Sequence, residues 1–193
     1  METNQSGAAA CGSYPAPGCS ALPPVLDVCC GSRMFWFDRK NPMAMFCDKR
    51  KEQHTLCDGR ELVVDPDMVA DFTNLPFPDD TFRLVVFDPP HMTSLGENSW
   101  LAKKYGRLTG DWHDDIREGF SECIRVLVPL GVLVFKWNCT DVPLNEVLSL
   151  APMRPLFGHT TGRQSKTYWV CFMKPNPKVR GGAQSSDVAK QEE

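Results

Sequence analysis

Four short apolar segments of this 193-residue chain end at or near an aspartate, and this pattern constrains the fold more than any other feature. The segments are PVLDVCC, AMFCD, MVADF and LVVFD, and their acids are Asp27, Asp48, Asp71 and Asp88. Strands that are apolar on both faces are typical of parallel sheets. Because the carboxyl ends of parallel strands share one edge of the sheet, we expect the four carboxylates to gather there.

Helical and irregular segments alternate with these strands, which predicts an α/β fold with a doubly wound sheet. GVLVFKW and KTYWVCFMK are two further strands, and ELVVD competes with MVADF for the third strand. Residues 111–129 predict an amphipathic helix that Pro129 and Gly131 end, and a shorter helix is expected after Pro143.

The composition suits one folded domain, with 42% hydrophobic and 23% charged residues. Residues 1–22 and 175–193 are rich in small and polar residues, so we expect disordered tails around a domain at 23–174. The sequence has no apolar run of membrane-spanning length and no secretory signal pattern. We therefore expect a cytoplasmic protein.

Nine cysteines are present, and Cys29 and Cys30 are adjacent. Several others lie in apolar runs, which favours buried free thiols over a disulfide framework. Cys47, His54 and Cys57 offer three ligands for a structural zinc, but the sequence contains no Cys-x-x-Cys pair. We expect no metal.

The segment VLDVCCGS resembles the first motif of class I S-adenosylmethionine-dependent methyltransferases, in the form D-P-x-C-G-[ST]-G of many adenine-specific amino-methyltransferases. The resemblance implies a Rossmann-like domain whose last strand is antiparallel, and S-adenosylmethionine as cofactor. It also implies that the cofactor is bound by Asp27, Cys29, Gly31 and Ser32. The chain departs from the motif at two positions, with Val28 in place of proline and Arg33 in place of a second glycine.

The next two strand ends extend this resemblance. It implies that Asp48 binds the ribose hydroxyls, and that Asp71 and the amide of Phe72 meet the adenine ring. The run LPFPDDTFR before the fourth strand is similar to a run common in the methyltransferase superfamily. A dehydrogenase or a P-loop enzyme would carry a glycine-rich fingerprint, and neither fingerprint is present.

The corner Asp88-Pro89-Pro90-His91 resembles the fourth motif, [DNS]-P-P-[YFWH], of methyltransferases that act on conjugated amino groups. The resemblance implies that the Asp88 carboxylate and the Pro89 carbonyl accept the two N–H bonds of the substrate amine. Two prolines hold such a carbonyl in a stiff corner. His91 takes the place of the aromatic residue that stacks on the target base.

The resemblance extends to small phage- and prophage-encoded methyltransferases, and it implies transfer of a methyl group to an exocyclic amino nitrogen. A base in DNA or RNA, adenine N6 first, is the leading acceptor, reached by flipping or in a single strand. In the loop after His91, the aromatic residues Trp100, Tyr105, Trp112 and His113 are interleaved with the cations Lys103, Lys104 and Arg107, which suits a stacked base and its phosphates. A lid whose aromatic residues cover the core and whose lysines are solvated is an equal alternative. Lys136 and Trp137 are further candidates for lining the pocket.

Two alternatives stay open. The acidic net charge of −3, the short chain and His91 in place of a larger aromatic residue suit a small-molecule or protein-amide acceptor. The glycine-poor first motif suits a non-catalytic S-adenosylmethionine-binding protein. The oligomeric state is not readable from the sequence.

Overall fold

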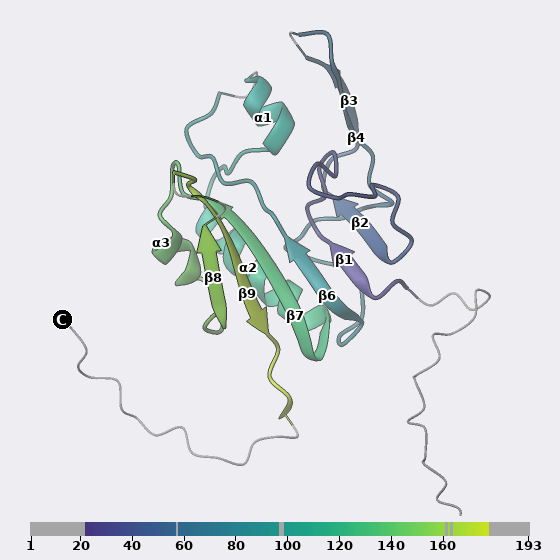
Figure 1. The fold of residues 1–193 in the computed structure, drawn as a ribbon, viewed down its shortest axis with the longest axis vertical. Coiled ribbons are helices and arrows are strands. Elements are labelled where there is room, and N and C mark those ends of the chain that lie inside the picture. The colour runs from purple at the N-terminus through teal and green to yellow at the C-terminus, as the bar shows by residue number, and fades with distance from the viewer. Residues whose placement is uncertain (1–21, 57, 97–98, 161, 163, 178–193) are drawn as a thin grey trace, which may run out of the picture.

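The computed structural model describes residues 22–56, 58–96, 99–160, 162 and 164–177, so both predicted tails fall almost wholly outside the described residues. The strands are β1 (Val25–Asp27), β2 (Ala44–Asp48), β3 (Glu52–Thr55), β4 (Glu61–Val64), β5 (Met68–Val69), β6 (Phe82–Phe87), β7 (Leu127–Asn138), β8 (Phe157–Thr160) and β9 (Thr167–Met173). The helices are α1 (Trp100–Tyr105), α2 (Trp112–Val126) and α3 (Leu144–Leu148). Figure 1 shows their arrangement.

Within the described residues, seven strands form one sheet in the order β5-β2-β1-β6-β7-β9-β8. The strands β5, β2, β1, β6 and β7 are parallel, and β9 is antiparallel to both β7 and β8. The predicted α/β, Rossmann-like fold with a mostly parallel sheet and an antiparallel last strand is confirmed. The strand order reverses between β1 and β6, and open α/β sheets bind their ligands at such a switch point.

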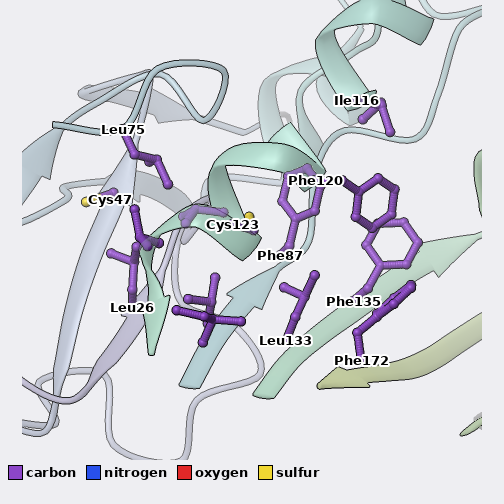
Figure 2. Packing of buried hydrophobic residues seen from close by; sticks show 14 of the residues in the cluster. Leu26, Cys47, Leu75, Phe87, Ile116, Phe120, Cys123, Leu133, Phe135 and Phe172 are labelled. Carbon is purple, nitrogen blue, oxygen red and sulfur yellow. The ribbon is translucent and has the colours of Figure 1, made fainter. Parts of the chain in front are cut away.

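Helix α2 covers one face of the sheet and contributes its apolar side to the core. Its apolar stripe includes Ile116, Phe120 and Cys123, all fully buried. Phe120 lies between Phe87, Phe135 and Phe172 of three strands, with ring centroids 4.8–5.7 Å apart (Figure 2). Burial of this stripe, rather than helix propensity alone, stabilises α2.

The opposite face of the sheet is covered differently. A second, smaller cluster of Cys30, Ala44 and Phe46 lies there, and Phe35 and Trp36 lie over its strands. Phe35 meets Trp169 edge to face at 5.7 Å, and Trp36 meets Phe46 in the same way at 4.8 Å. The loop after β1 therefore covers part of this face of the sheet.

Several predicted boundaries are wrong in detail. Helix α2 ends at Val126, because the next residue, Leu127, already pairs with Phe82 as the first residue of β7. Pro129 and Gly131 thus lie inside a strand rather than ending a helix. The two segments that competed for the third strand both form strands: Met68–Val69 joins the sheet as β5, and Glu61–Val64 pairs with β3 in a separate hairpin.

The hairpin β3–β4 projects past the carboxyl edge of the sheet, the edge at which α1 also lies (Figure 1). None of the helices in the described part of the chain is long and apolar enough to cross a membrane.

Candidate functional site

A cavity of about 750 Å³ lies at the carboxyl edge of the sheet, around the switch point between β1 and β6. Its size is typical of small-molecule and cofactor sites. Ten of the eleven predicted site residues line it: Cys29, Gly31, Ser32, Asp48, Asp71, Phe72, Asp88, Pro89, Pro90 and His91. The eleventh, Asp27, does not.

The loop after β1 forms the floor of the cavity. Gly31 has φ +49°, a conformation that side chains with a Cβ rarely adopt, and a Cβ added there would meet no atom within 4 Å. The Gly31 N–H donates to Asp48 Oδ2 at 2.9 Å, which ties this loop to the end of β2. Arg33 also has a positive φ, +55°, so the loop turns toward the cavity through two left-handed residues, only one of which is a glycine.

Asp27 lies beneath this loop and is fully buried. Its Oδ2 accepts from Trp36 Nε1 at 2.7 Å, and its Oδ1 accepts from the Cys29 N–H at 3.3 Å. Burial raises the pKa of Asp27 to about 7, although both hydrogen bonds oppose the shift. This placement favours a role in holding the loop over contact with a ligand.

Arg33, at the position of a missing second glycine, points away from the cavity. Its guanidinium lies 3.9 Å from the Phe46 ring centroid and binds Asp67 at 2.9 Å. It also donates to the carbonyls of Arg39 and Asp65. Arg33 therefore stabilises the loop by contacts on the side away from the cavity, and its side chain does not occupy the cavity beside Gly31.

Asp48 and Arg50 connect the cavity to α1. The Asp48 Oδ1 accepts from both the backbone N–H and the Nε of Arg50, at 2.9 and 3.2 Å. The same guanidinium donates to the carbonyl of Lys103 in α1 at 2.9 Å. Asp48 therefore has its carboxylate fixed before any ligand binds.

Asp71 and Phe72 form a turn after β5 at the other side of the cavity. Asp71 accepts from the N–H and hydroxyl of Thr73, and its Oδ2 binds the Lys49 ammonium at 2.7 Å. Phe72 packs edge to face on Phe87, with ring centroids 5.4 Å apart. The pair offers an apolar ring beside a hydrogen-bond acceptor, which suits a planar nitrogenous ring.

The Asp88 corner follows β6 directly. Asp88 Oδ2 accepts from Lys136 Nζ at 2.5 Å, and the two side chains are only 18% and 23% exposed. Burial raises the pKa of Asp88 above its ordinary value, and the Lys136 ammonium opposes this shift. The sequence placed Lys136 at the pocket but did not indicate this ion pair, because the two residues are 48 positions apart.

His91 is 8% exposed, with its ring 6.2 Å from that of Tyr105 and 6.1 Å from that of Trp137. Burial lowers its pKa below the ordinary histidine value. His91 is therefore a neutral ring at the cavity wall near pH 7.

Of the candidates in the loop after His91, Trp100, Trp112 and His113 do not line the cavity. Lys103, Lys104, Tyr105 and Arg107 line the cavity, as does Phe35, which sequence reasoning missed. The prediction that Trp137 lines the pocket is wrong: Trp137 is fully buried, and its Nε1 donates to the Val142 carbonyl. Its alternation with Lys136 along β7 explains this, since neighbouring residues of a strand face opposite sides.

The two cysteines that line the cavity, Cys29 and Cys30, are protonated thiols. Burial raises the pKa of Cys29 and of Cys30 well above the ordinary thiol value, so neither is a thiolate near pH 7. In the described part of the chain, no three His, Cys, Asp or Glu residues are placed to hold a metal ion. Cys57, one of the three candidate zinc ligands, lies outside the described residues.

No protein-family model matches this sequence, and no curated protein matches it. Solved structures with a similar fold include the N-methyltransferase NodS from Bradyrhizobium japonicum, with 14% identity, a TM-score of 0.47, and coverage of 81% of this chain and 88% of that one. A S-adenosylmethionine-dependent methyltransferase from Methanosarcina mazei has 12% identity, a TM-score of 0.45, and coverage of 78% and 92%. A TehB-like methyltransferase from Corynebacterium glutamicum has 14% identity, a TM-score of 0.46, and coverage of 81% and 82%. At identities of 12–14%, this similarity concerns the fold alone.

Proposed function

We propose that this chain is a S-adenosylmethionine-dependent methyltransferase that methylates an exocyclic amino nitrogen of a nucleic-acid base, adenine N6 first. The main support for the proposal is that the residues expected to bind the cofactor and those expected to bind the acceptor line one cavity. The Asp88 corner opens into the same space as Gly31, Asp48 and Asp71, which come from three other segments of the chain.

The residues around the cavity fit S-adenosylmethionine. Asp48 would receive the ribose hydroxyls, and Asp71 with Phe72 would receive the adenine ring. Cys29, Gly31 and Ser32 would lie along the methionine portion, where Gly31 leaves room for close approach. When bound, the cofactor supplies an electrophilic methyl group on its sulfonium.

The Asp88 corner would supply the activation of the acceptor. A conjugated amino nitrogen is a weak nucleophile, because its lone pair is delocalised. In our proposal, Asp88 Oδ1 and the Pro89 carbonyl accept its two hydrogens and free the lone pair. Holding nitrogen and methyl carbon within about 3–3.5 Å and in line supplies much of the acceleration. His91 would support the acceptor ring from the side.

A small molecule or a protein amide is the second candidate acceptor. The low exposure of His91 favours it, because an imidazole that is 8% exposed offers little area for stacking on a base. A screen with isotope-labelled methyl donor against DNA, tRNA, total RNA and a cell extract separates these acceptors. Label in DNA or RNA supports the first candidate, and label only in small molecules or protein contradicts it. Donor binding without any transfer would instead indicate a non-catalytic binding protein.

Replacement of Asp48 by alanine should weaken S-adenosylmethionine binding about 10–150-fold, because charge-assisted hydrogen bonds contribute about 1.5–3 kcal/mol. Isothermal titration calorimetry measures this directly. Asp58→Ala, which changes an exposed acid of the hairpin tip, is the matched control and should bind as the wild type does. Equal affinity in the wild type and the Asp48 variant would remove Asp48 from the cofactor site.

The lysines of α1 give a test of the nucleic-acid substrate. Lys103 and Lys104 line the cavity, and the Lys104 ammonium lies 4.9 Å from the Tyr105 ring centroid. Reversing both charges to glutamate should weaken binding of a short single-stranded oligonucleotide about tenfold or more at low salt, with a smaller effect at high salt. Fluorescence anisotropy reports the affinity. If the double variant binds the oligonucleotide as tightly as the wild type, the substrate does not pass over α1.

A further inference from the structure

Lys136 places an amine at the corner where the proposed reaction requires one. Its Nζ lies 2.5 Å from Asp88 Oδ2, and both side chains line the cavity. With 23% of its side chain exposed, Lys136 is more buried than most surface lysines. It thus already occupies one of the positions at which Asp88 can accept an N–H bond.

Two aromatic rings flank this ammonium. The Lys136 Nζ lies 5.7 Å from the ring centroid of Phe35 and 5.8 Å from that of Trp169. Cation–π attraction acts on alkylated ammonium groups as well as on unmodified ones. A methyl group added to Nζ keeps the positive charge, so the rings and Asp88 would stabilise the methylated side chain too.

We propose that Lys136 is a methyl acceptor within its own chain, which rests on the proposed methyltransferase function. The Lys136 proton moves to Asp88, and the lone pair on Nζ forms a bond to the methyl carbon of S-adenosylmethionine. The carbon–sulfur bond breaks with its electron pair on sulfur, which leaves S-adenosylhomocysteine. The product is a methylammonium group on Lys136, and the proton on Asp88 is lost to solvent.

The other lysines of the cavity differ from Lys136 in their partners. Lys49 binds Asp71 but is 71% exposed, and Asp71 lies at the far side from the Asp88 corner in the order of the strands. Lys104 lies over Trp100 and Tyr105 in α1. These lysines serve as internal controls, because they share the cavity without touching Asp88.

The purified chain is incubated with trideuteromethyl-labelled S-adenosylmethionine, and its peptides are mapped by mass spectrometry. We expect the label on Lys136 and not on Lys49, Lys103 or Lys104. At a fixed, saturating donor concentration the rate per chain should not change when the chain is diluted, because Lys136 and the bound donor belong to the same complex. A rate that falls with dilution, or label spread over many lysines, would overturn the proposal.

Two variants separate the chemistry from the fold. Asp88→Asn should slow labelling about 10²-fold or more, because it removes the base while keeping the side-chain shape. Lys136→Arg keeps a cation beside Asp88 and should carry no label at position 136. An ordinary methyl group on Lys136 of the isolated wild-type protein, absent from the Asp88→Asn variant, is a second supporting readout that needs no added donor.

Calorimetry with S-adenosylhomocysteine distinguishes failure of the self-methylation proposal from failure of the proposed methyltransferase function. If the ligand binds and Lys136 carries neither the label nor an ordinary methyl group, the self-methylation proposal fails and the methyltransferase function stands. If neither S-adenosylhomocysteine nor S-adenosylmethionine binds, the proposed function fails and this inference fails with it.

Discussion

Replacement of Asp88 by alanine should lower methyl transfer to the acceptor found in the screen by about 10²–10³-fold or more, which is the size of effect seen when one aligned hydrogen-bonding group is removed from an active site. The cofactor affinity should change less than twofold, because Asp88 is assigned to the substrate amine and not to the cofactor. Single-turnover rates with saturating acceptor measure the first quantity, and calorimetry measures the second.

Asp88→Asn is the informative companion, because it keeps a carbonyl oxygen that accepts an N–H bond and removes only the charge. If acceptance of the amine hydrogen carries the effect, the asparagine variant should retain clearly more transfer than the alanine variant. Equal losses would mean that the negative charge, or the ion pair with Lys136, is the essential feature. Unchanged transfer in Asp88→Ala would remove the corner from the mechanism.

A loss of stability in the Asp88→Ala variant can be distinguished from a loss of the catalytic hydrogen-bond acceptor. Asp88→Ala leaves the Lys136 ammonium without this carboxylate partner in a partly buried position, which costs stability. The double variant Asp88→Ala, Lys136→Met removes that unpaired cation. If the double variant recovers thermal stability but not transfer, the loss of activity comes from the missing acceptor.

The sequence predicted the strands near the site well because their signal is local. AMFCD is β2 residue for residue, and each of the four acids lies at or just after the end of its strand. Parallel pairing then fixes which ends are neighbours, so Asp48, Asp71 and Asp88 reach the same cavity. Short continuous apolar runs that end at or near an acid were sufficient to predict this part of the fold.

What the sequence could not show depends on contacts between distant residues. The Asp88–Lys136 pair and the contact of Arg50 with the Lys103 carbonyl join residues 48 and 53 positions apart. Strand β3 and its pairing with β4 were missed because EQHT has little apolar character, whereas Leu62 and Val64 of β4 are buried. Helix α2 was extended too far because its last turn and the start of β7 are both apolar, and only the pairing of Leu127 with Phe82 marks the change.

Asp27 is the most informative departure. A strand-end acid is expected to face the cavity, but the loop after β1 folds back over this one and carries Trp36 onto it. The side chain is thereby removed from solvent, and its chemistry becomes that of a buried carboxyl group rather than of a ligand.

This burial has a large consequence for the pH dependence of stability. The pKa of Asp27 is raised from 3.8 to about 7 in the folded chain, while the unfolded chain keeps the ordinary value. Between these two pH values the unfolded state releases the proton and the folded state keeps it. The free energy of unfolding therefore falls as the pH rises from about 4 to 7, and the contribution of Asp27 is fully present only below about pH 4.

At 1.36 kcal/mol for each pH unit, this contribution is on the order of 4 kcal/mol over the whole window. Urea unfolding of the wild type and of Asp27→Asn, at several pH values from 4 to 8, measures it. Because the asparagine does not titrate, the stability of the variant relative to the wild type should rise through this window and level off above about pH 7. The difference between the two profiles cancels the titration of all other groups to a first approximation.

Trp36→Phe tests the assigned cause. Its Nε1 hydrogen bond lowers the pKa of Asp27 against the effect of burial, so its loss should move the upper end of the window to higher pH. The ¹³C chemical shift of the Asp27 carboxyl group, followed against pH, gives the same pKa without unfolding the chain. A carboxyl group that titrates near pH 4 in the folded protein would mean that water reaches Asp27, and the loop after β1 would then not be the closed cover on which the floor of the cavity depends.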